Sequence, residues 1–302
     1  MSADQQQRRI AFIGLGVMGG PMAGHLRAAG HDVVAYNRTP SRARDWRERH
    51  GGELADSPAA ASEGADVVFT CVGRDEDLQA VTTGSEGIFA GLSAGAVCVD
   101  HSTVSARLSR ELARILEARG AAFIDAPVSG GQAGAEAGRL AIMAGGQAAA
   151  FAHVEPLLQA YGGRIVHMGE VGTGQLTKMA NQICVAGLVQ GLAEGVDFAR
   201  RADLDLERVL EAIGGGASQS WQMDNRARTM AAGEFDFGFA VEWMRKDLCI
   251  CLEEARENGA ALPVTALVDQ FYARLQEMGH GREDTSSLIR LLDGSAGSPG
   301  TF

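Results

Sequence analysis

The feature that most constrains this chain is a glycine-spaced turn that directly follows an apolar run. In "RRIAFIGLGVMGG" the residues Gly14, Gly16 and Gly19 have the spacing G-x-G-x-x-G between an expected strand and an expected helix. Gly14 permits a tight turn, Gly16 lets a pyrophosphate approach the backbone, and Gly19 lets the helix pack closely on the strand. Free N–H groups at the start of that helix attract phosphates. The turn therefore predicts a dinucleotide-binding unit at the beginning of the chain.

Short apolar runs alternate with helical stretches through the rest of the first half. Strands are expected in "DVVAYN", "ADVVFTCV", "AVCVD", "AAFIDAPV", "LAIMAG" and "RIVHMG", and helices in residues 20–29, 41–50 and 105–119, among others. Most of the early runs are continuously apolar, as a sheet covered by helices on both faces requires. The alternation predicts a Rossmann-type, doubly wound α/β sheet of parallel strands.

The pattern changes after about residue 172. Only helical patterns follow, in residues 175–200, 206–213, 241–258, 263–278 and 285–292. The first of these has apolar residues around most of its circumference, which indicates a helix buried on several sides. We therefore expect two domains: a Rossmann-like cofactor-binding domain in residues 1–170, and an all-helical domain for substrate binding and oligomerisation in residues 171–302.

Composition excludes several classes of function. The net charge of −11 argues against nucleic acid or an anionic membrane surface as the main partner. No apolar run reaches the ~18 residues of a membrane span, and the polar residues 1–9 lack the apolar core of a secretory signal. The five cysteines form no CxxC pair and no metal-ligand spacing. This favours reduced thiols in a cytoplasmic protein without a metal site.

The end of the second expected strand bears on the choice of dinucleotide. NAD-preferring sites usually place Asp or Glu there, about 20 residues after the glycine turn, to hold the ribose 2′-hydroxyl. This chain has Asn37, Arg38 and Thr39 instead. No carboxylate repels a 2′-phosphate, and the Arg38 guanidinium offers a planar fork suited to one. We expect NADP(H) to be preferred over NAD(H).

A lysine and an amide stand at the start of the long helix, in "GTGQLTKMANQI". Lys178 and Asn181 are three residues apart and therefore share one face of that helix. Upstream, Ser129, Gly130 and Gly131 form a turn after a strand. The exposed N–H groups of such a turn suit a small carboxylate, although the same residues are equally consistent with a structural turn.

Five segments, in order along the chain, are "FIGLGVMGGPMAGHL", "VDHSTVS", "DAPVSGGQAGAEAGRLAIMAGG", "GTGQLTKMANQ" and "VEWMRKDLCICLEEA". Together they resemble the β-hydroxyacid dehydrogenase family, which includes 3-hydroxyisobutyrate dehydrogenase, tartronate semialdehyde reductase and the glyoxylate/succinic semialdehyde reductases. The resemblance extends from residue 10 to about residue 292. It implies an oxidoreductase that interconverts a small 3-hydroxy acid or 2-hydroxy acid and its semialdehyde or keto acid by hydride transfer with a nicotinamide cofactor.

The resemblance also implies roles for individual residues. Lys178 matches the family's catalytic lysine, which protonates the carbonyl oxygen during reduction, and Ser129 and Asn181 are expected to assist it. Ser129, Gly130 and Gly131 match the carboxylate-binding turn, and either Asn181 or the adjacent Gln182 orients the substrate. The expected cofactor contacts are Gly14, Leu15, Gly16, Val17, Met18, Gly19, Asn37, Arg38, Thr39, Val72, Gly73, Thr103 and Lys246.

Elementary chemistry agrees with the role of Lys178. A hydride that arrives at a carbonyl carbon leaves negative charge on the oxygen, which needs a proton. A free lysine, with a pKa of about 10.4, holds its proton too tightly for the reverse reaction. Near a helix N-terminus, in a partly dry cleft at the domain junction, positive potential and desolvation favour the neutral amine.

Two alternatives share the same fold. An NADPH-dependent imine reductase has the same two-domain plan, although such enzymes usually carry Asp or Tyr in place of Lys178. A catalytically inactive scaffold member would use the fold for assembly alone. Phe237 and Trp243 depart from the family's usual residues and add aromatic bulk, which allows a larger substrate. Apolar stripes on the helical half predict a homodimer or a homotetramer.

Overall fold

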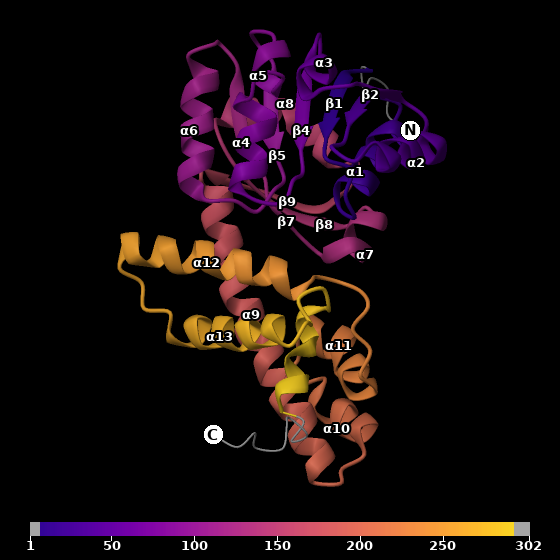
Figure 1. Ribbon diagram of the computed structural model, residues 1–302, viewed down its shortest axis with the longest axis vertical. Coiled ribbons are helices and arrows are strands. Elements are labelled where there is room, and N and C mark those ends of the chain that lie inside the picture. The colour runs from indigo at the N-terminus through magenta and orange to yellow at the C-terminus, as the bar shows by residue number, and fades with distance from the viewer. Residues whose placement is uncertain (1–6, 293–302) are drawn as a thin grey trace. The chain divides into compact units, whose positions relative to one another are not determined.

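The computed structural model describes residues 7–292 (Figure 1). The chain forms two compact units, which divide between Lys178 and Met179. The division lies inside helix α9 (Thr173–Arg201), so this helix begins in the first unit and continues in the second. Lys178 is thus the last residue of the first unit.

A nine-stranded sheet forms the centre of the first unit. Its order is β3-β2-β1-β4-β5-β6-β8-β7, and β9 also pairs with β8. The strands are β1 (Arg9–Ile13), β2 (Asp32–Tyr36), β3 (Glu53–Leu54), β4 (Val67–Thr70), β5 (Val97–Asp100), β6 (Ala122–Asp125), β7 (Val128–Ser129), β8 (Leu140–Gly145) and β9 (Gly162–Gly169). The predicted Rossmann-type sheet is confirmed, because β1 lies between β2 and β4 and these pairs are parallel.

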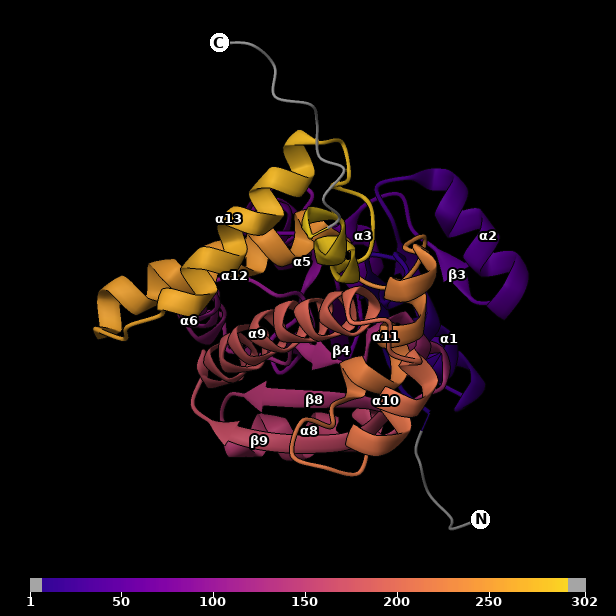
Figure 2. The same ribbon diagram turned by 90° about the horizontal axis from the view of Figure 1, so that it is seen from below.

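The sheet is not parallel throughout, which differs from the expectation. Strand β8 runs antiparallel to both β6 and β7. Strand β9 runs parallel to β8, as their two arrows in Figure 2 show. The run "AAFIDAPV", expected as one strand, divides into β6 and β7. Both parts pair with β8 in one continuous register, in which Asp125 faces Gly145 and Val128 faces Ile142, so the chain keeps its direction through the proline and reverses only after Ser129.

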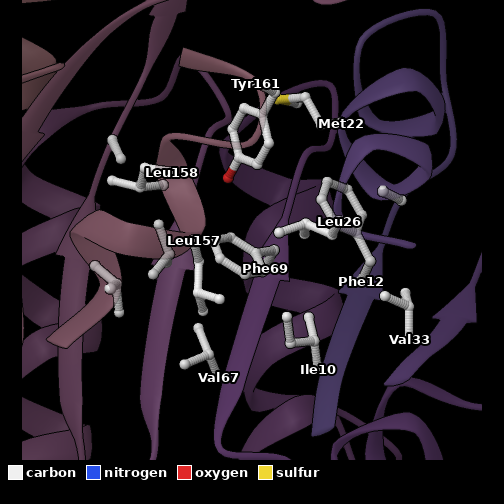
Figure 3. Close-up of a cluster of buried hydrophobic side chains, with 14 of the residues drawn as sticks. Ile10, Phe12, Met22, Leu26, Val33, Val67, Phe69, Leu157, Leu158 and Tyr161 are labelled. Atoms are coloured by element: carbon white, nitrogen blue, oxygen red, sulfur yellow. The ribbon is translucent and has the colours of Figure 1, made fainter. Parts of the chain in front are cut away.

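Helices cover both faces of this sheet (Figure 1). They are α1 (Gly19–Ala28), α2 (Pro40–His50), α3 (Pro58–Ser62), α4 (Asp75–Thr83), α5 (Ile88–Gly91), α6 (Ala106–Glu117), α7 (Gly131–Glu136) and α8 (Ala148–Leu158). Successive residues of a strand point to opposite faces. In β1, Ile10 and Phe12 pack with residues of α1 and α8 (Figure 3), whereas Ala11 and Ile13 pack with residues of α4 and α6. This double burial explains why the early strands are continuously apolar.

One histidine of this core has a structural role. The ring of His101 hydrogen-bonds through Nδ1 to the Ala126 carbonyl oxygen at 2.6 Å and through Nε2 to the Tyr161 hydroxyl at 2.8 Å. Burial lowers the pKa of His101 to about 4. The imidazole is therefore neutral near pH 7: Nδ1 donates to the carbonyl, and Nε2 accepts from the tyrosine.

The described part of the second unit contains helices and no extended strand, as predicted. Besides α9 it contains α10 (Leu206–Ile213), α11 (Trp221–Ala232), α12 (Val241–Asn258), α13 (Pro263–Glu277) and a 3-10 helix, η1 (Thr285–Leu291). Helices α12 and α13 lie side by side (Figures 1 and 2). The apolar faces of all six elements share one core. Helix α11 was not predicted, and the last expected helix is a 3-10 helix.

Candidate active site

The glycine turn joins β1 to α1 and has the geometry of a dinucleotide site. Gly14 has a φ of +101°, and a Cβ atom there would lie 2.2 Å from the Cys71 carbonyl oxygen. A Cβ atom on Gly19 would lie 2.0 Å from the Gly14 carbonyl oxygen. The protein's own packing therefore requires both glycines. A Cβ atom on Gly16 would meet no atom within 4 Å, so the fold needs no glycine there and the open space suits a pyrophosphate.

The start of α1 favours the same ligand. Met18, at the N-cap position, makes no side-chain hydrogen bond to the first turn. Leu15 is buried beneath the turn, whereas the Val17 side chain is exposed. Uncapped N–H groups at a helix start are a binding site for phosphate. The residues present thus fit the dinucleotide that the sequence predicted.

Asn37 ties this turn to the end of β2. Its Oδ1 accepts a hydrogen bond from the Leu15 N–H at 2.9 Å, and its Nδ2 donates to the Thr39 carbonyl oxygen at 3.0 Å. The next residue, Arg38, is exposed, and its Nη1 lies 2.8 Å from Oδ1 of Asp77 in α4. Arg38 therefore lies close to the glycine turn, and a bound phosphate would compete with the Asp77 carboxylate for its guanidinium.

The expected contacts Val72, Gly73 and Thr103 follow β4 and β5, which are neighbours in the sheet. The Val72 N–H donates to Ser102 Oγ at 2.8 Å, and the Ser102 N–H donates to Asp100 Oδ1 at 3.1 Å. These bonds hold the two segments together at the carboxyl edge of the sheet, where ligands bind in this kind of fold. Sequence reasoning assigned no role to Asp100 or Ser102, although the polar run after the strand was a signal.

Ser129, Gly130 and Gly131 form the turn between β7 and α7. Gly130 and Gly131 have φ values of +130° and +62°, which side chains rarely adopt. A Cβ atom on Gly131 would nevertheless meet no atom within 4 Å. Backbone conformation, rather than crowding, requires glycine at residue 131, and space remains beside the turn for a small anion.

Helix α9 begins against the carboxyl ends of β6 and β8. Asp125, the last residue of β6, accepts hydrogen bonds from the N–H groups of Gly172 and Gln175 at 2.7 and 2.8 Å. Burial raises the pKa of the Asp125 carboxyl group to about 7. A Cβ atom on Gly174 would lie 2.4 Å from the Met143 carbonyl oxygen. Hydrogen bonds and close packing therefore fix the start of the helix to the sheet.

Lys178 lies on the second turn of α9 and is only 8% exposed. Lysine is rarely buried to this degree unless it is paired or functional. The first unit therefore contains the glycine turn, Arg38, Thr103, Ser129 and Lys178 together. These are the residues expected to bind the nucleotide, to bind the substrate carboxylate and to transfer the proton.

The remaining expected residues form a polar network in the second unit. Gln182 is buried, and its Nε2 donates to Asp247 Oδ2 at 2.6 Å, while its Oε1 accepts from Asn181 Nδ2 at 2.7 Å. The Lys246 ammonium lies 2.9 Å from Asp247 Oδ1. Because a carboxylate only accepts, Asp247 fixes the orientation of the Gln182 amide. Sequence reasoning did not predict the link between Asp247 and Gln182.

Phe237 belongs to a separate arrangement in the same unit. The Arg226 guanidinium carbon lies 4.7 Å from the centre of the Phe237 ring and 5.0 Å from that of the Trp221 ring. Its Nε lies 3.0 Å from Oδ1 of the buried Asp284. The aromatic side chain of Phe237 thus helps to hold the loop that precedes α12.

Within residues 7–292, no group of three or more His, Cys, Asp and Glu side chains is arranged to hold a metal ion. Over the same range, every helix is too short or too polar to cross a membrane.

Two family models match the chain. The model of the NAD binding domain of 6-phosphogluconate dehydrogenase matches residues 9–169, and that of the NAD-binding of NADP-dependent 3-hydroxyisobutyrate dehydrogenase matches residues 172–292. The chain belongs to the β-hydroxyacid dehydrogenase family. The resemblance seen in the sequence is thereby confirmed, and this β-hydroxyacid dehydrogenase is an NAD(P)-dependent enzyme that acts on hydroxy acids.

Individual relatives of this β-hydroxyacid dehydrogenase match over nearly its whole length. An uncharacterized oxidoreductase of Shewanella frigidimarina (strain NCIMB 400) is 58% identical over 287 residues, which are 95% of this chain and 99% of that protein. The mitochondrial 3-hydroxyisobutyrate dehydrogenase of Mus musculus is 31% identical over 94% of this chain and 86% of its own. The 3-hydroxyisobutyrate dehydrogenase of Mycobacterium tuberculosis, solved with L-serine, has a TM-score of 0.87 and 30% identity over 96% of this chain and 100% of its own.

Proposed function

We propose that this enzyme is an NADP-dependent reductase of a small carboxylate-bearing semialdehyde or keto acid, and in the reverse direction an oxidant of the matching 3-hydroxy or 2-hydroxy acid. Lys178 is the general acid in reduction and the general base in oxidation. Residues 1–170 bind the cofactor, and residues 171–302 serve substrate binding and assembly.

The observation that carries this proposal is the buried Lys178 in the same compact unit as the glycine turn. Its helix starts from Asp125 at the carboxyl end of β6, the edge of the sheet at which the glycine turn also lies. A buried lysine ammonium can lie beside the substrate carbonyl oxygen and donate its proton as negative charge develops on that oxygen. The cofactor, when bound, would supply the hydride.

The turn at Ser129 supports binding of the substrate carboxylate. Gly130 and Gly131 both have positive φ, and backbone turns of this kind can present successive N–H groups to an anion. The Ser129 hydroxyl adds a further donor for the substrate oxygen. This arrangement would orient the carbonyl carbon without using a metal ion.

Asn181 and Gln182, the two amides that follow Lys178, have different roles in this proposal. Gln182 is committed to Asp247, and its Oε1 accepts from Asn181. We assign the orientation of the substrate to Asn181, which is half-buried and lies one turn beyond Lys178 on the same face of α9. Lys246 is held by Asp247 and contributes to the cofactor site.

Arg38 supports the preference for NADP(H). Residues 37–39 offer no carboxylate to a 2′-phosphate, and Asn37 keeps Arg38 close to the turn. The family model over residues 172–292 also describes an NADP-dependent enzyme.

A substrate screen tests the proposed function. Oxidation of NADPH is followed by absorbance with a panel of semialdehydes, keto acids and cyclic imines. We expect turnover with at least one carboxylate-bearing semialdehyde or keto acid. Turnover with cyclic imines alone would instead support an imine reductase, and NADPH binding without any turnover would support a scaffold.

We also propose that the protein is a homodimer or homotetramer. Leu188 and Phe198 on α9 and Val264 and Leu267 on α13 are exposed, with Phe198 70% exposed. A Cβ atom on Gly187 would lie 3.9 Å from Val264 Cγ1, so α9 and the start of α13 lie close together there. Light scattering should give a multiple of the 31.6 kDa chain mass. A mass near that of one chain contradicts the assembly.

A further inference from the structure

Gln175 connects the helix that carries Lys178 to the segment that carries Thr103. Its side chain is fully buried. Its Nε2 donates to the Ser102 carbonyl oxygen at 2.8 Å, and its Oε1 accepts from the Val104 N–H at 3.2 Å. One amide therefore holds the backbone on both sides of Thr103.

Such an amide is costly to bury unless both ends are paired. A backbone acceptor at residue 102 and a backbone donor at residue 104 engage both ends of it. Because these groups belong to the loop and not to α9, the amide does not stabilise its own helix. What it fixes is the position of the loop relative to the helix.

The helix is itself held rigidly at this point. The Gln175 N–H donates to Asp125, and Gly174 packs so closely on the sheet that a Cβ atom would lie 2.5 Å from the Asp125 carbonyl oxygen. Lys178 follows Gln175 by three residues and lies on the same face, one turn along. Gln175 thus links the segment around Thr103 directly to the fixed helical turn that precedes Lys178.

We propose that Gln175 is a positioning residue for hydride and proton transfer, an inference that rests on the proposed function. It holds the Thr103 segment, which is expected to contact the cofactor, in register with Lys178, which donates the proton. The amide itself takes no part in the chemistry. A displacement of about 1 Å between reacting groups can lower a rate by ~100-fold.

The first test replaces the amide by an apolar side chain. In Gln175→Leu we expect kcat to fall by ~100-fold and the deuterium isotope effect on kcat, measured with cofactor deuterated at the transferred position, to increase. NADPH affinity, measured by fluorescence, is expected to be roughly retained. Hydrogen exchange of the Val104 amide should become faster. Gln190→Leu is the matched control on the same helix, because Gln190 pairs with Glu194 and not with a loop.

The second test uses a nearly isosteric acid. In Gln175→Glu, a protonated carboxyl group can donate to the Ser102 carbonyl oxygen and accept from the Val104 N–H, as the amide does, whereas the ionised group can only accept. Burial favours the protonated form. We therefore expect the ratio of variant to wild-type kcat to rise as the pH is lowered from about 8 to about 6. A role limited to filling space would leave this ratio constant.

Two results would overturn the proposal: a folded Gln175→Leu with wild-type kcat, or a Gln175→Glu whose kcat ratio does not depend on pH. If Gln175→Leu does not fold, the pH profile of Gln175→Glu decides. A wild-type protein that turns over no compound of the panel contradicts the proposed function instead. In that case the exchange rate of the Val104 amide in the variants still shows whether Gln175 holds the segment.

Discussion

Arg38 and Asp77 form an ion pair across the expected nucleotide site, with Nη1 of the arginine 2.8 Å from Oδ1 of the aspartate. Arg38 comes from the end of β2 and Asp77 from the first turn of α4. A 2′-phosphate would bring a second partner to the same guanidinium. The pair therefore bears directly on cofactor preference.

Replacing Arg38 by alanine should weaken NADPH binding by ~1.5–3 kcal/mol, the range for hydrogen bonds to charged groups. NADH has no 2′-phosphate, so its affinity should change little. Fluorescence titration of both cofactors measures the difference. Equal losses for NADPH and NADH would rule out recognition of the 2′-phosphate by Arg38.

Replacing Asp77 by asparagine should act in the opposite direction. The Arg38 side chain is 84% exposed, and exposed ion pairs contribute ~0.2–1 kcal/mol. Without the carboxylate, NADPH should bind more tightly by no more than this amount, and the gain should shrink at high salt. A weaker affinity for NADPH in Asp77→Asn would mean that Asp77 orients Arg38 and does not compete for it.

Replacing Lys178 by alanine should lower turnover at least ~100-fold, the contribution of a general acid or base. NADPH affinity should be roughly retained. Lys178→Arg is the matched variant, since it keeps the positive charge but does not release a proton near neutral pH. Near-normal turnover in Lys178→Arg would show that charge alone, and not proton transfer, is required.

Gly16 and Gly19 of the turn should respond differently to alanine. Gly16→Ala places a methyl group in open space, so thermal stability should be unchanged while cofactor affinity falls. Gly19→Ala brings a methyl group within 2.0 Å of a carbonyl oxygen and should destabilise the protein itself. Thermal unfolding with and without NADPH separates the two effects. Unchanged NADPH affinity in Gly16→Ala would show that no ligand approaches the backbone there.

The Asp125 carboxyl group should make stability depend on pH. Burial raises its pKa from 3.8 to about 7, so between these values the folded protein holds a proton that the unfolded chain has released. Its contribution to the free energy of unfolding therefore decreases as the pH rises through this window. Urea unfolding of the wild type and of Asp125→Asn at several pH values gives the difference. A difference that is constant from about pH 4 to about pH 7 contradicts the raised pKa.

Local patterns were sufficient for much of the fold. The boundaries of α10 and α12 match the expected ranges, and the strand, turn and helix at residues 9–28 follow from apolar periodicity and glycine spacing. Helix α11 is too polar to be recognised from apolar periodicity. Its ends do carry signals, because Ser220 caps its start and Gly233 ends it in the left-handed conformation. Strand β3 has only two residues and no apolar run.

In the candidate site, some residues could be predicted from the sequence, whereas their hydrogen-bond partners could not. Motifs and family resemblance pointed to Lys178, Ser129 and Arg38, whose roles stay predictions. The partners of such residues were not accessible, because Gln175 meets Val104 and Asp125 meets Gly172 only after the chain folds. Pairings between residues so distant in sequence leave no periodicity or spacing to detect.

Asn37 stabilises the glycine turn through its side-chain oxygen and the following loop through its side-chain nitrogen. The Leu15 N–H needs only an oxygen from this side chain, which an aspartate would also supply, but the second carboxylate oxygen could not donate to the Thr39 carbonyl oxygen as the amide does. Exchange of the NH2 group for oxygen would keep the bond to the glycine turn, remove the bond to Thr39 and add a negative charge at the end of β2. A single amide-to-acid replacement beside Arg38 would therefore disfavour a 2′-phosphate by charge, while the Leu15 N–H kept its hydrogen bond.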